Sequence, residues 1–284
     1  MDRITLTAPA KINLSLRILG RRPDGFHELD TLMAPLRIAD TLEIAHASGQ
    51  GISLTCNDPE IPDGEENLCV KAAALFLQET GLSHGISITL MKRIPHGAGL
   101  GGGSSDAAAV LTGMNELFDS PLVPEELALL GARLGSDVPF FFHGGPARCQ
   151  GRGEVLGVAS RVPERSLLLV KPPFPVPTAW AYGEYAGLRE SGLIPVSQRE
   201  RFLGDIPVVN DLEGPVFRKY LLLPVLREAM EKAAGVECTF MTGSGSTMVA
   251  SFQPGTPGEC IRELREALTE AFGPTLWMSE TSFA

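Results

Sequence analysis

Residues 95–109 read PHGAGLGGGSSDAAA, a glycine-rich turn that runs into an alanine-rich segment. Glycine lacks a Cβ, so its backbone N–H groups can approach an anion closely and converge on it. The apolar residues that follow recur at helical spacing and predict a helix that begins at Ser104 or Ser105, whose free N–H groups add a partial positive charge. The stretch therefore predicts a phosphate-binding loop made of Pro95, His96, Gly97, Ala98, Gly99, Leu100, Gly101, Gly102, Gly103, Ser104 and Ser105.

Other glycine-rich motifs fit this loop less well. A Walker A loop ends in Gly-Lys-Ser or Gly-Lys-Thr, and this loop has no lysine there. Gly97, Gly99 and Gly102 do match G-x-G-x-x-G. A dinucleotide fold, however, needs an unbroken strand before the loop, and Pro95 interrupts that strand. It also needs an acidic residue at the end of the next strand, whereas Asp119 lies at the end of a predicted helix. The glycine loop of protein kinases requires a later H-R-D segment, which the sequence lacks.

The composition is that of a globular protein without an excess of basic residues. The 284 residues are 44% hydrophobic, enough for two domains, and the net charge of −10 argues against a nucleic-acid-binding surface. No apolar run reaches the roughly 18 residues of a membrane span. The five cysteines are widely spaced and form no CxxC pair, and no signal-peptide pattern is present, so we expect free thiols in a cytoplasmic protein.

The spacing of apolar residues predicts a mixed α/β fold of the α+β type. Residues 11–18 alternate between polar and apolar, which predicts a half-buried strand with Lys11 and Asn13 on its polar face. The proline-rich segment 171–177 changes the character of the chain, so we expect two domains, residues 1–160 and 161–284. Further expected elements are helices over 67–80, 124–134, 219–234 and 257–272, a strand over 85–94, and a strand-turn-strand unit around 243–246.

Three segments together resemble the GHMP kinases, the family that includes galactokinase, homoserine kinase and mevalonate kinase. Residues 95–109 resemble the second motif of that family, residues 8–14 (APAKINL) its first, and residues 241–247 (MTGSGST) its third. The resemblance covers residues 4–250, most of the chain. It implies a two-domain fold with the active site in the cleft between the domains, ATP and Mg²⁺ as cofactors, and a small-molecule acceptor.

Further segments narrow the resemblance to one branch of the family. The triple glycine at 101–103, the segment RRPDGFHEL (21–29) and the segment GSDVPFF (135–141) are similar to the kinases that act on 4-diphosphocytidyl-2-C-methyl-D-erythritol. This similarity implies transfer of the γ-phosphoryl group of ATP to a tertiary hydroxyl, the 2-hydroxyl, in the non-mevalonate isoprenoid pathway. It implies no nucleic-acid or membrane partner, and we expect a monomer or a weak homodimer.

Phosphoryl transfer requires a group that accepts the proton of the attacking hydroxyl and groups that stabilise negative charge. By the resemblance, Asp137 is the proton acceptor. Lys11 would orient Asp137 and stabilise the developing charge, and Asn13 would bind hydroxyl groups of the substrate.

The resemblance assigns the rest of the acceptor site to aromatic and small residues, because a flat polar ring such as cytosine is held by aromatic faces and edge hydrogen bonds. Related enzymes often have tyrosine where this chain has Phe26, so stacking is retained while a hydroxyl contact is lost. Gly243 and Ser244 would approach the substrate diphosphate or the γ-phosphate. The implied acceptor residues are Phe26, His27, Thr178, Tyr182, Gly243 and Ser244.

At the adenosine end the resemblance points to Asn67, Leu68, Lys92 and Asp106. Related enzymes often have asparagine at the position of Asp106, and a carboxylate beside phosphates is unfavourable. We therefore expect Asp106 to face the ribose or the adenine amine, away from the phosphates. The sequence shows no dedicated carboxylate cage for Mg²⁺, so no metal ligand is assigned.

Two alternatives stay open at this point. One is a GHMP kinase for another alcohol, such as homoserine or mevalonate, and the acceptor that drives ATP turnover would decide between them. The other is an inactive nucleotide-binding module on the same fold, against which the presence of both Lys11 and Asp137 argues.

Overall fold

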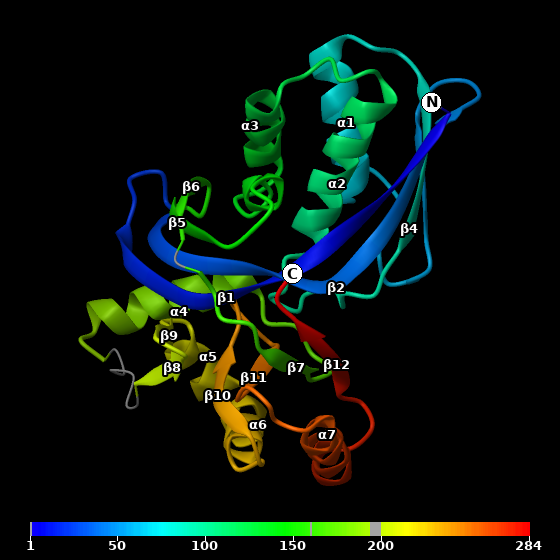
Figure 1. The fold of residues 1–284 in the computed structure, drawn as a ribbon. Helices are drawn as coiled ribbons and strands as arrows, with labels where there is room; N and C mark the ends of the chain where they lie inside the picture. Colours follow the sequence, from blue (N-terminus) through cyan, green and yellow to red (C-terminus); the bar gives the residue numbers. More distant parts are fainter. Residues whose placement is uncertain (1, 160, 194–199) are drawn as a thin grey trace.

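The computed structural model describes residues 2–159, 161–193 and 200–284 of the chain. These residues form two β-sheets, each covered by helices on its outer face, so the expected mixed α/β fold is confirmed (Figure 1). Among the described residues, no helix is both long enough and apolar enough to cross a membrane.

The larger sheet joins strands from both halves of the sequence. Its order is β3-β4-β2-β1-β9-β8, with β5 paired to β2 and β6 paired to β5. The strands are Arg3–Arg21 (β1), His27–Ala47 (β2), Ile52–Cys56 (β3), Gly85–Met91 (β4), Ala147–Gly151 (β5), Val155–Val158 (β6), Arg201–Leu203 (β8) and Ile206–Asn210 (β9). The smaller sheet has the order β10-β11-β7-β12, with strands Ser166–Lys171 (β7), Val236–Met241 (β10), Met248–Phe252 (β11) and Trp277–Ser282 (β12).

The helices of the first half cover one face of the larger sheet (Figure 1). They are α1 (Leu68–Thr80), α2 (Gly102–Leu117) and α3 (Pro124–Leu134), followed by a short 3₁₀ helix (Pro139–Phe142). The α1 helix begins where the side chain of Asn67 accepts the N–H of Cys69 at 2.8 Å, and it ends at Gly81, which adopts a left-handed conformation. The starts predicted for α1 and α3 are confirmed, whereas α2 begins at Gly102, earlier than expected.

The second half contributes α4 (Thr178–Glu190), α5 (Glu213–Lys219), α6 (Leu222–Glu231) and α7 (Gly258–Phe272). Figure 1 shows α6 and α7 on the side of the smaller sheet that faces away from the larger one. Leu226 of α6 and Leu264 of α7 are buried in one apolar cluster with Met248 of β11. The sequence predicted one helix over 219–234. In the structure, α5 ends at Lys219, and the helix that follows, α6, spans only Leu222–Glu231.

Strand β1 belongs to the larger sheet, and its central residues are buried on both faces. Ile12 and Leu14 belong to an apolar cluster with Leu169 of β7 and Phe240 of β10. The opposite face carries Lys11 and Asn13, each only 4% exposed. The sequence predicted a strand buried on one face only. Alternation shows that one face is apolar, but it cannot show that the polar face is buried as well.

At two irregularities in β1, backbone N–H groups form hydrogen bonds that hold the loops of the cleft. The register with β2 shifts between Pro9 and Lys11, and the N–H of Lys11 donates to the carbonyl of Leu100 at 2.9 Å. Close to the next shift, the N–H of Asn13 donates to the hydroxyl of Thr242 at 2.9 Å. Strand β1 therefore anchors both the glycine loop, residues 95–105, and the turn around Gly243.

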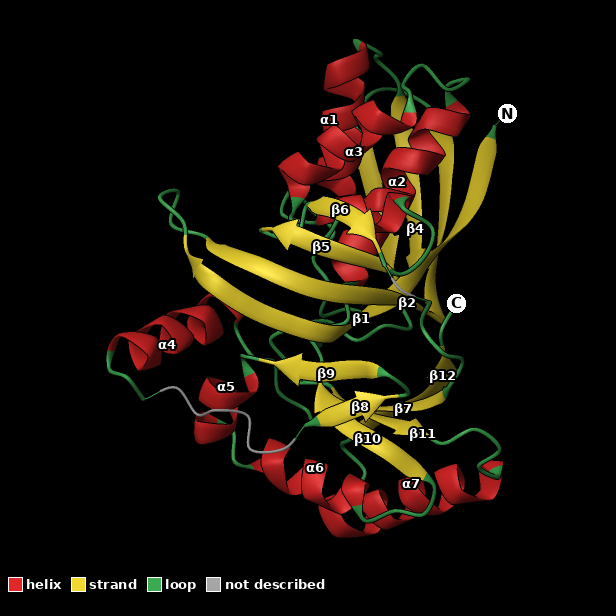
Figure 2. Cartoon of the chain, turned by 60° about the vertical axis from the view of Figure 1, so that its left-hand side comes forward, coloured by secondary structure: helices red, strands yellow, loops and turns green. Residues whose placement is uncertain are grey.

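Strands β8 and β9 come late in the sequence but extend the larger sheet. β9 runs parallel to β1, with Ser15 opposite Val209. Figure 2 shows β9 beneath the long curved pair β1 and β2, with α4 under the far end of that pair. The division into domains of residues 1–160 and 161–284 stays a prediction.

Candidate active site

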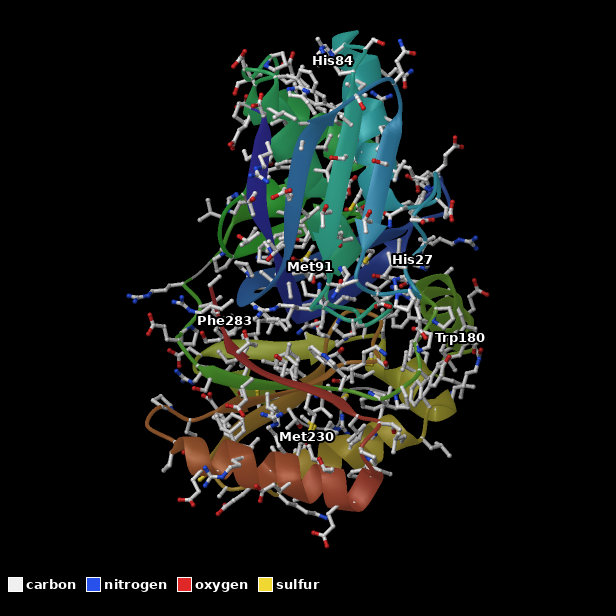
Figure 3. All side chains as sticks on the ribbon, turned by 90° about the vertical axis from the view of Figure 1, so that its right-hand side faces the viewer. His27, His84, Met91, Trp180, Met230 and Phe283 are labelled. Carbon is white, nitrogen blue, oxygen red and sulfur yellow. The ribbon has the colours of Figure 1, made fainter. Side chains whose placement is uncertain are left out.

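A cleft of about 1140 Å³ is lined by residues from both halves of the chain. Figure 3 shows His27 where these halves meet, on the same side as Trp180 of α4. Every candidate site residue except Ser105 lines the cleft, namely Lys11, Asn13, Phe26, His27, Asn67, Leu68, Lys92, Pro95, His96, Gly97, Ala98, Gly99, Leu100, Gly101, Gly102, Gly103, Ser104, Asp106, Asp137, Thr178, Tyr182, Gly243 and Ser244. Ser105 is buried in the first turn of α2, where its N–H donates to the carbonyl of Gly101 at 2.9 Å.

The glycine loop packs backbone to backbone against the turn around Gly243. A Cβ on Gly99 would lie 2.5 Å from the carbonyl oxygen of Thr242, and one on Gly243 would lie 2.9 Å from the carbonyl oxygen of Gly99. Both residues also have positive φ angles, 76° and 58°, which glycine adopts at little cost. Glycine is therefore required on both sides of this contact, and the first turn of α2 follows directly with its free N–H groups.

Lys11 and Asp137 meet in the cleft beside this loop. The Nζ atom of Lys11 lies 3.3 Å from Oδ2 of Asp137 and donates to Oδ1 of Asn13 at 2.7 Å. Asn13 in turn donates to the hydroxyl of Thr31 at 2.8 Å, which fixes the orientation of its amide. Lys11 is almost fully buried while the side chain of Asp137 is 34% exposed, so the carboxylate is the member of the pair that a ligand can reach.

Lys92 lies between two buried carboxylates. Its Nζ atom is 2.5 Å from Oδ2 of Asp40 and 2.7 Å from Oδ2 of Asp106. Asp40 also accepts the backbone N–H groups of Arg93 and Ile94, at 2.5 and 2.9 Å. Asp40 therefore fixes both the lysine and the segment that leads into the glycine loop.

Asp40 is the residue at this end of the cleft that sequence reasoning missed. It is fully buried on β2, at a position between Ile38 and Leu42 where the alternation of the strand requires an apolar side chain. A carboxylate at such a position is the signal that could have found it, because a buried charge needs a partner.

Burial and the neighbouring charges shift the pKa values of Asp106 and Lys92. Burial raises the pKa of Asp106, the ammonium of Lys92 opposes this, and the charge of Asp40 adds to it, so that the pKa of Asp106 rises to about 7. Burial would lower the pKa of Lys92, but the charges of Asp106 and Asp40 raise it. The Oδ1 atom of Asp106 is buried and has no hydrogen-bond partner among the described residues. This oxygen can accept a hydrogen bond from a ligand in the cleft.

The other end of the cleft is an aromatic wall formed by Phe26, His27 and Tyr182. The rings of His27 and Tyr182 stack, with centroids 5.2 Å apart and planes 25° from parallel. Burial, and after it the charge of Arg21, lowers the pKa of His27, so the imidazole is neutral near pH 7. Its Nε2 atom is buried and has no hydrogen-bond partner among the described residues. Phe26 is half exposed, and the guanidinium of Arg152 lies 4.8 Å from the centre of its ring.

The two predicted residues beside this wall contact each other. The hydroxyl groups of Thr178, at the start of α4, and Ser244 lie 2.9 Å apart. Asn210, which sequence reasoning missed, donates from its amide to the carbonyl oxygens of Met241 and Gly243, both at 2.8 Å. Asn210 lies at the end of β9, so the pairing of β9 with β1 positions the turn that carries Ser244.

The described residues include no group of three or more His, Cys, Asp or Glu side chains that could hold a metal ion. Ser104 at the start of α2 lines the cleft, and a hydroxyl is a hard oxygen ligand of the kind that Mg²⁺ prefers. The five cysteines are free thiols, as expected.

The chain is similar to known proteins over nearly its whole length. Residues 67–145 match the family model described as GHMP kinases N terminal domain. The chain is 47% identical over 273 residues to the 4-diphosphocytidyl-2-C-methyl-D-erythritol kinase of Methylacidiphilum infernorum. The aligned region covers 95% of this chain and 93% of the relative.

Solved structures agree with this similarity. A crystal structure of 4-(cytidine 5'-diphospho)-2C-methyl-D-erythritol kinase superimposes with a TM-score of 0.78 at 36% identity, covering 99% of this chain and 100% of that chain. A homoserine kinase from Cytophaga hutchinsonii superimposes with a TM-score of 0.66 at 19% identity, covering 100% and 95% of the two chains. At that identity the second likeness shows the fold alone.

Proposed function

The chain belongs to the 4-diphosphocytidyl-2-C-methyl-D-erythritol kinases, a branch of the GHMP kinases, and from this we propose that it phosphorylates the 2-hydroxyl of 4-diphosphocytidyl-2-C-methyl-D-erythritol with ATP. The observation that carries this proposal is the Lys11–Asp137 pair, 3.3 Å apart, in the same cleft as the glycine loop. This reaction would be a step of the non-mevalonate route to isoprenoid precursors.

Asp137 acts as the general base of the proposed reaction. Its exposed carboxylate accepts the proton of the 2-hydroxyl while the hydroxyl oxygen bonds to the γ-phosphorus and the bond to ADP breaks. Lys11, held by Asn13 at 2.7 Å, fixes the orientation of Asp137 and stabilises negative charge that develops on the transferred group.

The glycine loop binds the phosphates of ATP. Its backbone N–H groups and the first turn of α2 supply donors and a partial positive charge without charged side chains. Ser104, which lines the cleft and has a hard hydroxyl oxygen, would hold Mg²⁺ together with phosphate oxygens, and the ion would neutralise negative charge on the phosphates. Asp106 offers its unpartnered Oδ1 to the adenine amine or a ribose hydroxyl, which is away from the phosphates.

The aromatic wall binds the cytosine of the acceptor. Phe26 and Tyr182 provide the faces on which the flat ring stacks, and the unpartnered Nε2 of the neutral His27 provides an edge hydrogen bond. Thr178 and Ser244, in contact at 2.9 Å, border the path between the cytosine and the loop.

Product analysis tests this function. Incubation with ATP and 4-diphosphocytidyl-2-C-methyl-D-erythritol should give one ADP per acceptor and one new phosphomonoester. Because the 2-carbon carries no hydrogen, the new phosphorus NMR signal should show no three-bond coupling to a proton. A signal split by proton coupling would place the phosphate on another hydroxyl, and the absence of ADP would reject the acceptor.

A further inference from the structure

The acceptor proposed above carries a diphosphate, an anion that lysine and arginine side chains bind through strong charge-assisted hydrogen bonds. Among the described residues that line the cleft, the permanently cationic side chains are those of Lys11, Arg21, Lys92 and Arg152. Lys92 is held between two carboxylates, and Lys11 is held by Asn13 and Asp137. The arginines are therefore the candidates for the diphosphate.

The turn between β5 and β6 places Arg152 between the two ends of the acceptor. Next to it, Gly153 lies against the base, since a Cβ on Gly153 would be 3.6 Å from Oδ1 of Asp137. The guanidinium of Arg152 lies over the ring of Phe26, 4.8 Å from its centre. The hydroxyl that reacts must lie at Asp137 and the cytosine at Phe26, so the diphosphate that joins them passes beside Arg152.

We propose that Arg152 binds the diphosphate of the acceptor and so sets the distance between the cytosine and the reacting hydroxyl. This inference rests on the proposed function and adds a residue to it. Arg21 is less suited, because it ends β1 with an exposed side chain and, among the described residues, is in no cation–π contact with an aromatic ring.

The surroundings of Arg152 leave one edge of its guanidinium open. Its backbone N–H donates to Oε2 of Glu154 at 2.6 Å, and its Nε atom lies 3.5 Å from Oε1 of the same residue. The two terminal nitrogens have no hydrogen-bond partner among the described residues, and the side chain is only 30% exposed. Stacking on Phe26 orients the planar group, so its two free nitrogens can form the paired hydrogen bonds that arginine makes with phosphate.

Comparing inhibition by CDP with inhibition by cytidine separates the loss of a diphosphate contact from a general change in the aromatic wall. In the Arg152→Met variant, the inhibition constant of CDP against the acceptor should rise about 10- to 100-fold, the usual effect of losing charge-assisted hydrogen bonds. The constant of cytidine and the KM of ATP should stay near the wild-type values. Arg152→Lys should recover part of the affinity for CDP, because it restores the charge without the planar fork.

Arg148→Met is the matched control. Arg148 lies on β5, its side chain is 58% exposed, and it pairs with Asp30 outside the cleft, so both constants should be unchanged. Equal weakening of CDP and cytidine in Arg152→Met, or no weakening of either, would overturn the assignment. Turnover by the wild-type enzyme tests the function separately. If the wild type shows no turnover, the proposed function and this inference are both rejected. If the wild type shows normal turnover and the inhibition constant of CDP is unchanged in Arg152→Met, this inference alone is rejected.

Discussion

The glycine loop is held by backbone contacts and buried ion pairs, whereas the aromatic wall is built from side chains of separate segments. Gly99 and Gly243 touch through their backbones, and Lys92 is fixed by two buried carboxylates. Phe26 and Tyr182, by contrast, come from the β1–β2 turn and from α4, and Phe26 is half exposed.

This difference indicates which parts of the site tolerate substitution. The loop has little room to rearrange at Gly99, because the nearest atoms there are main-chain atoms of Thr242 and Gly245. The wall can adjust, because its members are side chains with solvent beside them. Substitutions on the loop side should therefore affect chemistry and ATP binding strongly, and substitutions in the wall should mainly raise the KM of the acceptor.

The largest effect is expected at the base. Asp137→Asn keeps the shape of the side chain but removes its ability to accept a proton, so kcat should fall about 10²- to 10⁴-fold. ATP affinity, measured by calorimetry, should stay nearly the same, since the ion pair of Asp137 is with Lys11 rather than with a phosphate-binding group of the loop. A kcat close to that of the wild type would remove Asp137 from the mechanism.

The next largest effect is expected in the loop. A Cβ on Gly102 would lie 3.0 Å from Cγ2 of Ile94 and 3.2 Å from Nζ of Lys92, so Gly102→Val should push the loop out of place. We expect ATP to bind about 10-fold or more weakly, as when one charged hydrogen-bonding partner is lost. Gly258→Val, at an open position at the start of α7, is the control. Equal ATP affinity in the two variants would count against the loop as the phosphate site.

A smaller effect is expected in the aromatic wall. Tyr182→Ala removes the ring that stacks on His27, and the KM of the acceptor should rise about 10-fold, in line with the value of base–aromatic stacking. Tyr182→Phe keeps the ring and should stay within about 3-fold of the wild type. If the Phe variant is impaired as much as the Ala variant, the hydroxyl rather than the stacked ring contributes the binding.

The smallest effect concerns stability and pH. Burial, opposed by Lys92 and assisted by Asp40, raises the pKa of Asp106 to about 7, so the folded protein keeps a proton there that the unfolded chain releases near pH 4. The contribution of Asp106 to stability is therefore present at low pH and lost as the pH rises toward 7. Relative to Asp106→Asn, the free energy of unfolding of the wild type should fall by about 1 kcal/mol between about pH 6 and about pH 7. Urea titrations that give the same difference at both pH values would contradict this.

The local features of the site could be predicted from the sequence. The starts of α1 and α3 depend on neighbouring residues, and the structure has them where the sequence predicted them. The glycine loop is shorter than predicted, because α2 already begins at Gly102. The catalytic roles of Lys11 and Asp137 came from the family resemblance, and they stay predictions although the two side chains meet in the cleft.

The long-range features could not be predicted. Asp40 binds a lysine 52 positions later, and Asn210 supports a turn only because β9 pairs with a strand from the other end of the sequence. These contacts are decided by how strands order themselves in a sheet, which no local pattern records. A role for Arg152 could not be predicted for the same reason, because its turn approaches Phe26 and Asp137 only in the folded protein.

The most direct test of the account is the initial rate of ADP release with each of three acceptors at equal concentration: 4-diphosphocytidyl-2-C-methyl-D-erythritol, homoserine and mevalonate. Turnover with the cytidine diphosphate-linked alcohol should be at least about 10³-fold faster than with the other two, because only this acceptor reaches the wall and the base together. Turnover with homoserine or mevalonate, and none with the cytidine-linked acceptor, would contradict it.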